Sequence, residues 1–142
     1  MPEQAYCCEM AGPPKPVPKV LIWVGTSKED LSGFDEEVRR VMGFALFVAQ
    51  LGDKHPDAKV LRGFGSAGVL EVIEDSDGAT FRSVYTVKFS GRLFVLHAFQ
   101  KKSKKGAKTP KAEIDLVKKR LEEAERIHAE LGPVARITGG TK

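Results

Sequence analysis

The chain has 142 residues, of which 42% are hydrophobic and 30% are charged, and this balance is typical of one globular domain. Twenty-three Lys and Arg against nineteen Asp and Glu give a net charge of +4, which favours a polyanionic partner over a cationic one. No stretch approaches the roughly 18 consecutive apolar residues that span a bilayer, and the chain does not open on a basic and then apolar leader. These observations disfavour a membrane or secreted protein, so we expect a cytoplasmic one with no membrane contact.

The N-terminal region differs in composition from the rest of the chain. Five of the eight prolines lie in its first 18 residues, where each removes a backbone donor and restricts its neighbour. The only two cysteines, Cys7 and Cys8, are adjacent and cannot form an unstrained disulfide, so we interpret them as free thiols, with a redox or metal-binding role as the alternative. The sequence predicts a flexible proline-rich arm over 1–18, a single domain over 19–132 and a flexible tail over 133–142.

The domain begins with a predicted strand and helical segment. Residues 20–24 are apolar and largely β-branched and are followed by Gly-Thr-Ser, a pattern typical of a strand. Ser27 is expected to cap the next helix. Apolar residues then recur every three or four positions, at Leu31, Phe34, Val38, Val41, Ala45 and Val48, with Phe44, Phe47 and Leu51 widening the stripe. We expect one long buried helix, or two in a hairpin, with Gly43 or residues 52–56 as the bend or stop.

Three further strands are predicted in the middle of the chain. The glycine-rich stretch 63–68 precedes an apolar run at 69–73 instead of a helix, which disfavours a nucleotide-binding loop. A turn at 75–78 leads into residues 80–89, whose alternation places Arg82 on the side away from the core. Residues 93–99 are nearly all apolar, as in a strand covered on both faces. These strands are expected to form a three-strand meander.

A last helix completes the prediction. Thr109 is expected to cap it, Pro110 to stand in its first turn and Gly132-Pro133 to end it. Its apolar face contains Ile114, Val117, Leu121, Ala124, His128 and Leu131. The expected fold class is α+β, with a small twisted, mainly antiparallel sheet built from a strand, a helix or helical hairpin, a three-strand meander and a C-terminal helix.

The positive charge is concentrated in one segment. Between residues 88 and 111 there is no acidic residue and there are eight basic ones: Lys88, Arg92, Lys101, Lys102, Lys104, Lys105, Lys108 and Lys111. Such a segment is either a cradle for a nucleic-acid backbone or a solvated loop. Arg82 and His97 favour the cradle, because an arginine can hold a phosphate with two hydrogen bonds and a histidine exchanges protons near neutral pH. A histidine in an apolar strand also fits a structural role.

Cleavage of RNA without a metal needs a base for the ribose 2′-hydroxyl, positive charge for the phosphorane and an acid for the leaving oxygen. The side chains available for these catalytic tasks are Arg82, Tyr85, His97, Lys101 and Lys102. Those expected to bind the RNA backbone are Lys88, Arg92, Lys104, Lys105 and Lys108. Since no Asp, Glu and His group has metal-ligand spacing and no Ser or Cys lies in a nucleophile elbow, we expect neither a metal nor a cofactor.

Two sequence blocks resemble the RelE/ParE toxin superfamily, and within it the phage-derived, HigB-like branch. The first is Phe-Arg-Ser-Val-Tyr at 81–85, and the second runs from Leu96 through Lys101-Lys102-Ser103 to Thr109-Pro110 at the start of a helix. Leu-Arg-Gly at 61–63 and Glu71 fit the earlier part of the pattern. The resemblance extends over residues 20–131 and implies a RelE-like fold, with helices packed on one face of the sheet.

The resemblance also implies a function. Members are toxins of type II toxin–antitoxin pairs that typically cleave mRNA on the ribosome and are held inactive by a cognate antitoxin, often a helix-turn-helix protein. By position, Arg82 corresponds to the arginine at the scissile phosphate, and Lys101 or Lys102 to a second basic catalytic residue; Tyr85 matches a position that is either catalytic or packed. Two alternatives remain open at this stage: a non-catalytic inhibitor of DNA gyrase or another host target, and a basic RNA-binding module.

Overall fold

A computed structural model describes residues 17–65, 68–101 and 109–133. Its elements, in chain order, are β2 (Val20–Trp23), α1 (Ser27–Ser32), α2 (Glu36–Gln50), β3 (Ala58–Val60), β4 (Val69–Ser76), β5 (Ala79–Thr86), β6 (Arg92–Lys101) and α3 (Lys111–Leu131). The predicted α+β class is therefore confirmed. Cys7, Cys8 and nearly all of the predicted arm and tail lie outside the described residues, so those predictions stay as they were.

The described strands form one five-stranded, mainly antiparallel sheet in the order β2-β6-β5-β4-β3. The predicted meander is β4-β5-β6, with both of its pairings antiparallel, and β2 joins it by pairing in parallel with β6. β6 is thus an interior strand, as its apolar sequence predicts. β3 pairs antiparallel with β4 and was not predicted, because two of its three residues are exposed and no apolar run marks it.

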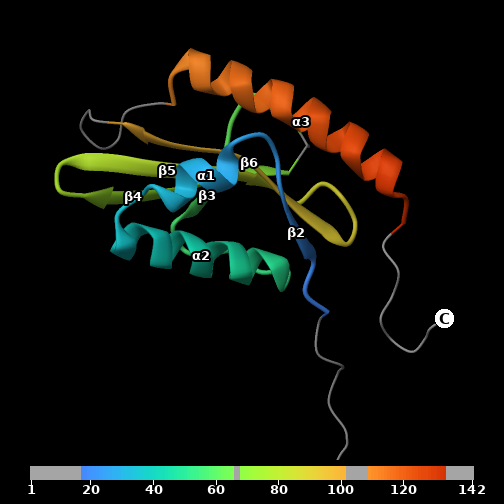
Figure 1. The fold of residues 1–142 in the computed structure, drawn as a ribbon, viewed down its shortest axis with the longest axis horizontal. Coiled ribbons are helices and arrows are strands. Elements are labelled where there is room, and N and C mark those ends of the chain that lie inside the picture. Colours follow the sequence, from blue (N-terminus) through green and yellow to red (C-terminus); the bar gives the residue numbers. More distant parts are fainter. Residues whose placement is uncertain (1–16, 66–67, 102–108, 134–142) are drawn as a thin grey trace, which may run out of the picture.

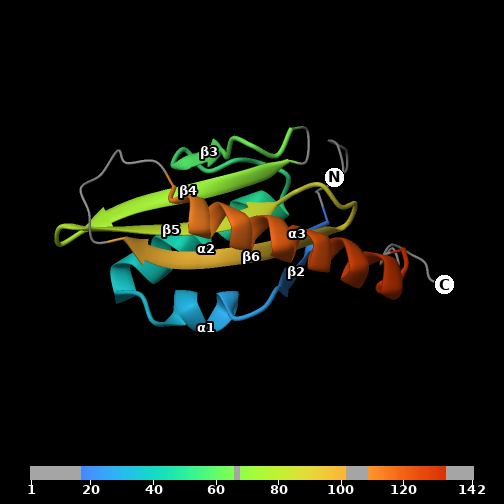
Figure 2. The ribbon, with the colours of Figure 1, turned by 90° about the horizontal axis from the view of Figure 1, so that it is seen from above.

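The helices cover both faces of the sheet (Figure 1), with α3 on one side and α2 on the other. α1 lies at the edge next to β6 (Figure 2), where β2 no longer pairs and the Ser27 hydroxyl donates to the Val95 carbonyl at 3.1 Å. The placement of all helices on one face, implied by the resemblance, is wrong. The physical reason is that both faces of the meander are apolar enough to need cover.

We call the side of the sheet that packs against α2 the α2 face, and the other side the α3 face. The α2 face is a continuous apolar cluster that includes Met42 from the helix and Tyr85 and Val95 from the sheet. Phe34 and Phe81 meet there edge to face, with ring centroids 4.9 Å apart. The α3 face has its own cluster of Val84, Phe94, Leu96, Val117 and Ala124 with neighbours. The sheet therefore separates two apolar cores, one on each face.

Two helices form in place of one long helix, and the break is at residues 33–35, where Gly33 ends α1 and Asp35 precedes α2. Gly43 lies inside α2 and does not bend it. The predicted cap at Ser27 is wrong, because Thr26 occupies the N-cap position and Ser27 is buried.

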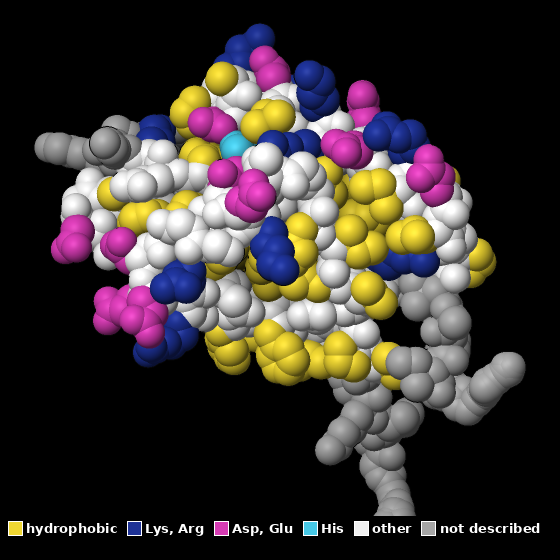
Figure 3. All heavy atoms as spheres, viewed as in Figure 1, with side chains coloured by type: hydrophobic (Ala, Val, Ile, Leu, Met, Phe, Trp, Pro, Cys, Tyr) yellow, Lys and Arg dark blue, Asp and Glu magenta, His cyan; other side chains and the backbone are white. Residues whose placement is uncertain are grey.

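The apolar stripe of α2 is narrower than predicted. Val38, Met42, Ala45, Leu46 and Ala49 are buried. Phe44 and Phe47 are 58% and 49% exposed, because α2 packs against the sheet with only one side. Figure 3 shows apolar side chains gathered along the edge of the molecule that α2 forms. The predicted burial of these two phenylalanines is therefore wrong.

Two local features fix the ends of the meander and of α3. Asp77 and Gly78 form a two-residue hairpin with φ of 50° and 78°, the positive values that a type I′ turn requires. At Gly132 φ is 73°, and α3 ends there as predicted. At the other end Pro110 stands at the N-cap position, so the predicted capping role of Thr109 is wrong; its hydroxyl bonds to Glu71 instead.

Candidate functional site

The register of β5 and β6 brings three predicted site residues to one face of the sheet. Thr80 pairs with Lys101, Arg82 with Phe99, and Val84 with His97. Arg82 therefore has His97 and Lys101 as its two diagonal neighbours, and diagonal neighbours in an antiparallel pair are typically about 7–8 Å apart. Because Val84 and Phe99 belong to the α3-side cluster, this group lies on the α3 face.

An irregularity in β6 produces this arrangement. The pairing shifts between Val84, which faces His97, and Tyr85, which faces Val95, so Leu96 is an extra residue in β6. Without this bulge, His97 would follow Val95 onto the α2 face, since side chains alternate with period two. The bulge reverses the phase of everything after it. It is the feature that places His97 and Lys101 on the same face as Arg82.

Arg82 takes part in a buried ion pair. Its guanidinium donates to the Glu71 carboxylate at 3.2 Å and to the Thr109 hydroxyl at 2.9 Å, and that hydroxyl donates in turn to Glu71 at 2.7 Å. Arg82 is 3% exposed and Glu71 5%. Arg82 does point away from the α2-side core, as the alternation predicts. However, the chain leading into α3 covers it.

His97 is the centre of a second polar group. Its Nε2 lies 2.5 Å from a carboxylate oxygen of Glu113, in the first turn of α3, and its Nδ1 lies 3.3 Å from the Arg120 guanidinium. The ring stacks on Phe99 with centroids 4.9 Å apart and planes 23° apart. Since Phe99 is the strand partner of Arg82, the two polar groups adjoin through one aromatic ring.

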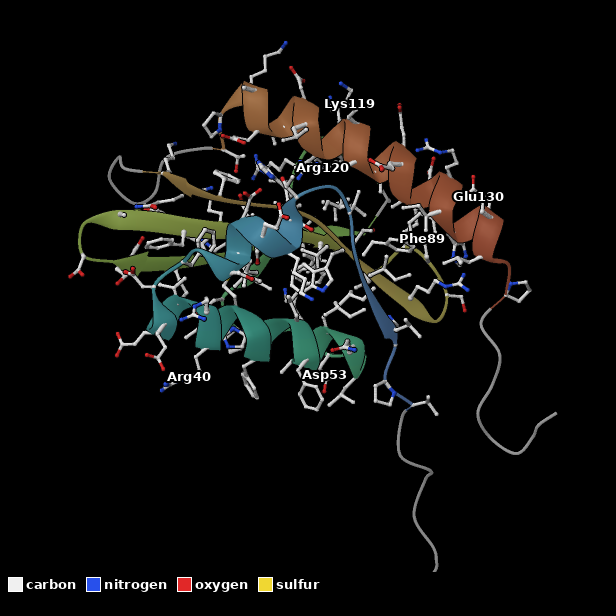
Figure 4. All side chains as sticks on the ribbon, viewed as in Figure 1. Arg40, Asp53, Phe89, Lys119, Arg120 and Glu130 are labelled. Atoms are coloured by element: carbon white, nitrogen blue, oxygen red, sulfur yellow. The ribbon has the colours of Figure 1, made fainter. Side chains whose placement is uncertain are left out.

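Arg120 ties this second group to the rest of the protein. Its guanidinium also donates to the Leu96 carbonyl and to the Thr26 hydroxyl, each at 3.1 Å, and Figure 4 shows Arg120 reaching down from α3 toward α1. A Cβ added at Gly25, where φ is 60°, would lie 2.7 Å from Nε of Arg120. The glycine therefore gives Arg120 both the backbone turn and the space that it needs.

Tyr85 is not brought to this site. It is 1% exposed and packs in the α2-side cluster, on the opposite face of the sheet from Arg82, because the two are three positions apart in a strand of period two. Burial raises the pKa of its hydroxyl to about 12. The grouping of Tyr85 with Arg82 in one catalytic site is therefore wrong, and the structure gives it a packing role.

Two of the residues expected to bind RNA are already engaged within the protein. Arg92 is 7% exposed, and its guanidinium donates to the Gly132 carbonyl at 2.6 Å and contacts Nδ1 of His128 at 2.9 Å, which fixes the end of α3. The Arg92 side chain is thus occupied at the end of α3, and its RNA-binding role stays a prediction. Lys88 is exposed, forms an ion pair with Glu125 and lies 5.5 Å from the centre of the Phe89 ring.

The remaining lysines fall in the sequence from the end of β6 to the start of α3. Lys101 is half-buried at the end of β6, on the same face as Arg82. Lys102, Lys104, Lys105 and Lys108 lie outside the described residues, so their predicted roles stay predictions. Lys101, at the start of the basic segment, and Thr109, after it, therefore both lie beside Arg82.

Glu113 and Arg120 were not predicted from the sequence as site residues. Together with Val117 and Ala124 they follow the i, i+4, i+7, i+11 spacing of one helix face, and Val117 and Ala124 are the two buried residues of α3. The sequence does carry a signal for them: charged residues stand at helix positions that share a face with the buried residues, and such positions are normally apolar.

The sequence matches a known protein family over more than half of its length. Residues 29–122 match the model of a family described as phage derived protein Gp49-like. The chain belongs to this family. The membership in a phage-derived branch that the two sequence blocks indicate is thereby confirmed. For this Gp49-like chain, no curated protein matches the sequence.

Two solved structures are similar to the Gp49-like chain. One is the toxin–antitoxin complex RelBE2 from Mycobacterium tuberculosis, with 17% identity, 61% of this chain and 95% of that chain covered, and a TM-score of 0.42. The other is a mutant of the E. coli toxin RelE in the free state, with 20% identity, 79% and 100% coverage, and a TM-score of 0.46. Among the described residues, no helix is both long and apolar enough to cross a membrane.

Proposed function

We propose that this Gp49-like protein is the toxin of a type II toxin–antitoxin pair, and that it inhibits translation as a metal-independent endoribonuclease that cleaves mRNA on the ribosome. Membership in the phage-derived family supports the toxin assignment. The observation that carries the nuclease assignment is the register that puts Arg82 between His97 and Lys101 on the α3 face, beside the start of the lysine-rich segment.

Arg82 is the residue that stabilises the reacting phosphate. Its planar guanidinium can donate two parallel hydrogen bonds to phosphate oxygens, and its charge favours the additional negative charge that develops as the 2′-oxygen attacks phosphorus. Glu71 holds the side chain in place through the buried ion pair. A phosphate reaches Arg82 only when Thr109 is displaced, because the Thr109 hydroxyl now bonds to the guanidinium.

The lysines are assigned to docking and charge neutralisation. Lys101 adjoins Arg82 on the same face. Lys102, Lys104, Lys105 and Lys108 follow it in sequence, and we assign their positive charge to binding the message backbone. The partners in this proposal are the ribosome-bound message and a cognate antitoxin, with a helix-turn-helix protein as the expected type.

Pulse labelling in cells tests the proposal. On induction of the chain, incorporation of a labelled amino acid should fall before incorporation of labelled thymidine. Induction of the double variant Arg82→Leu with Glu71→Leu, which removes both buried charges, should leave both near the uninduced rate. If DNA synthesis stops first, the target is gyrase or another replication component and the nuclease assignment is wrong. Uninterrupted growth with RNA bound in vitro would favour a basic RNA-binding module instead.

A further inference from the structure

The contacts of Glu113 separate it from the other acidic residues of α3. Its side chain is 31% exposed, yet one of its carboxylate oxygens lies 2.5 Å from Nε2 of His97, whose side chain is 7% exposed. Glu113 also follows Thr109 by one helical turn, and Thr109 bonds to Arg82. This carboxylate is therefore bonded to the buried network while its side chain stays partly exposed to solvent, one helical turn after the residue that contacts Arg82.

The hydrogen bonds of His97 define its tautomer. The Arg120 guanidinium can only donate, so Nδ1 of His97, 3.3 Å from it, is the acceptor and carries no proton. Nε2 then carries the proton and donates it to Glu113. With its proton on Nε2, the ring links Arg120 on one side to Glu113 on the other.

In this arrangement His97 is poorly placed to act as a general base, and Glu113 is the better candidate for that role. Both ring nitrogens of His97 are engaged and the ring is buried against Phe99. Within the part of the chain that the structure describes, His97 is the only side chain bonded to Glu113, so one carboxylate oxygen remains available to a substrate. An ionised carboxylate accepts protons, and the bond from His97 holds it in one orientation.

We infer that Glu113 is the general base of the nuclease site and that His97 and Arg120 are positioning residues that orient it. The inference rests on the proposed function and adds to it a catalytic residue from α3. In the reaction, Glu113 takes the proton of the ribose 2′-hydroxyl while the 2′-oxygen forms a bond to phosphorus. The bond from phosphorus to the 5′-oxygen breaks, water gives that oxygen its proton, and the proton on Glu113 passes to the hydroxide that remains. The products are a 2′,3′-cyclic phosphate and a 5′-hydroxyl.

Glu113→Gln is the sharpest test, because glutamine keeps the size of the side chain and an oxygen that can accept the His97 proton. We expect cleavage of ribosome-bound message to fall at least about a hundredfold, since general bases typically contribute 10²–10⁴-fold. Ribosome binding and the melting temperature should stay within error of the parent. The acidic limb of the pH–rate profile should also disappear, which a structural role of Glu113 would not cause.

Glu130→Gln is the matched control, because Glu130 is an exposed glutamate near the end of α3 (Figure 4), whereas Glu113 lies in the first turn of that helix. It should cleave at the parent rate. If Glu113→Gln also cleaves at the parent rate, the inference is wrong while the proposed function stands. If the parent chain itself does not cleave, the proposed function fails and this inference fails with it.

The positioning roles have a readout that does not depend on cleavage. Nitrogen-15 chemical shifts of the His97 ring should report a proton on Nε2 and none on Nδ1 in the parent, and this preference should weaken in Arg120→Leu. A ring protonated on Nδ1 in the parent would contradict the role assigned to Arg120. Arg120→Lys, which keeps a donor, should restore part of any cleavage that Arg120→Leu loses.

Discussion

The two faces of the sheet are built on different principles. The buried side chains of the α2 face are apolar except for small polar groups such as Ser83, which bonds to the Met42 sulfur. The α3 face buries Glu71, Arg82, Arg92 and His97. Burying paired charges gains little stability over an apolar core, and strained or costly groups concentrate where function requires them. We therefore attribute folding stability mainly to the α2 face and chemistry to the α3 face.

The largest expected effect on stability comes from breaking the ion pair on the α3 face. Arg82→Ala leaves the Glu71 carboxylate buried without its charge partner and should lower the free energy of unfolding by about 3–5 kcal/mol. Urea denaturation measures this. The double variant Arg82→Leu with Glu71→Leu should recover most of the loss, because it removes both charges. A single variant as stable as the parent would show that the pair is not buried in solution.

Arg92 offers a second way to test the α3 face, away from the proposed site. Arg92→Ala removes the donor to the Gly132 carbonyl and should lower the free energy of unfolding by about 1.5–3 kcal/mol, the range for charged hydrogen bonds. The salt dependence of ribosome binding should keep the parent slope, since Arg92 makes no phosphate contact in this account. A salt-dependence slope reduced by about one would show that Arg92 contacts a phosphate.

Glu74 is the exception on the α2 face, at its rim. Burial, a hydrogen bond with Asp57 and the charges of Asp57 and Asp75 raise its pKa from 4.5 to about 7. Between those pH values the unfolded chain releases a proton that the folded chain keeps, so the free energy of unfolding should fall as pH rises and level off above about pH 7.

Because Glu74 is partly exposed, we expect this fall to be on the order of 1 kcal/mol after solvent screening. Glu74→Gln should abolish it, and urea denaturation at pH 5 and pH 8 measures the difference for both chains. An equal fall in parent and variant would assign the pH dependence to another group.

Only a small effect is expected at Tyr85, and none on cleavage. Tyr85→Phe keeps the ring in the α2-side core, so the free energy of unfolding should change by less than about 1.5 kcal/mol. Cleavage per folded molecule should equal that of the parent. A loss of cleavage with intact stability would place the hydroxyl in the chemistry and remove the distinction between the two faces.

Much of the fold could be predicted because most elements have a short-range pattern of apolar and turn residues. The apolar run of β6, the alternation of β5 and the Gly132 stop of α3 each predict their element directly. The break at Gly33 and the short strand β3 could not be predicted, because neither has a pattern longer than three residues.

The site was only partly predictable for a related reason. Arg82 follows from the phase of one strand, and its neighbour Lys101 from the charge of one segment. The bulge at Leu96 reverses the phase of β6, and single-strand alternation cannot reveal it. Likewise, Glu113 and Arg120 join the site only because α3 packs over His97. These two residues are 16 and 23 positions from His97 in the sequence.

Cleavage of ribosome-bound message by the parent, Arg82→Leu with Glu71→Leu, and Tyr85→Phe tests the central claim most directly. The first two chains differ in the α3-face charge pair, and the third carries its change on the α2 face. We predict that the parent and Tyr85→Phe generate 5′-hydroxyl ends at the same rate, and that the double variant, folded as judged by urea denaturation, is at least about a hundredfold slower. Equal rates for all three chains would contradict the account, because cleavage would then not involve the Arg82 site.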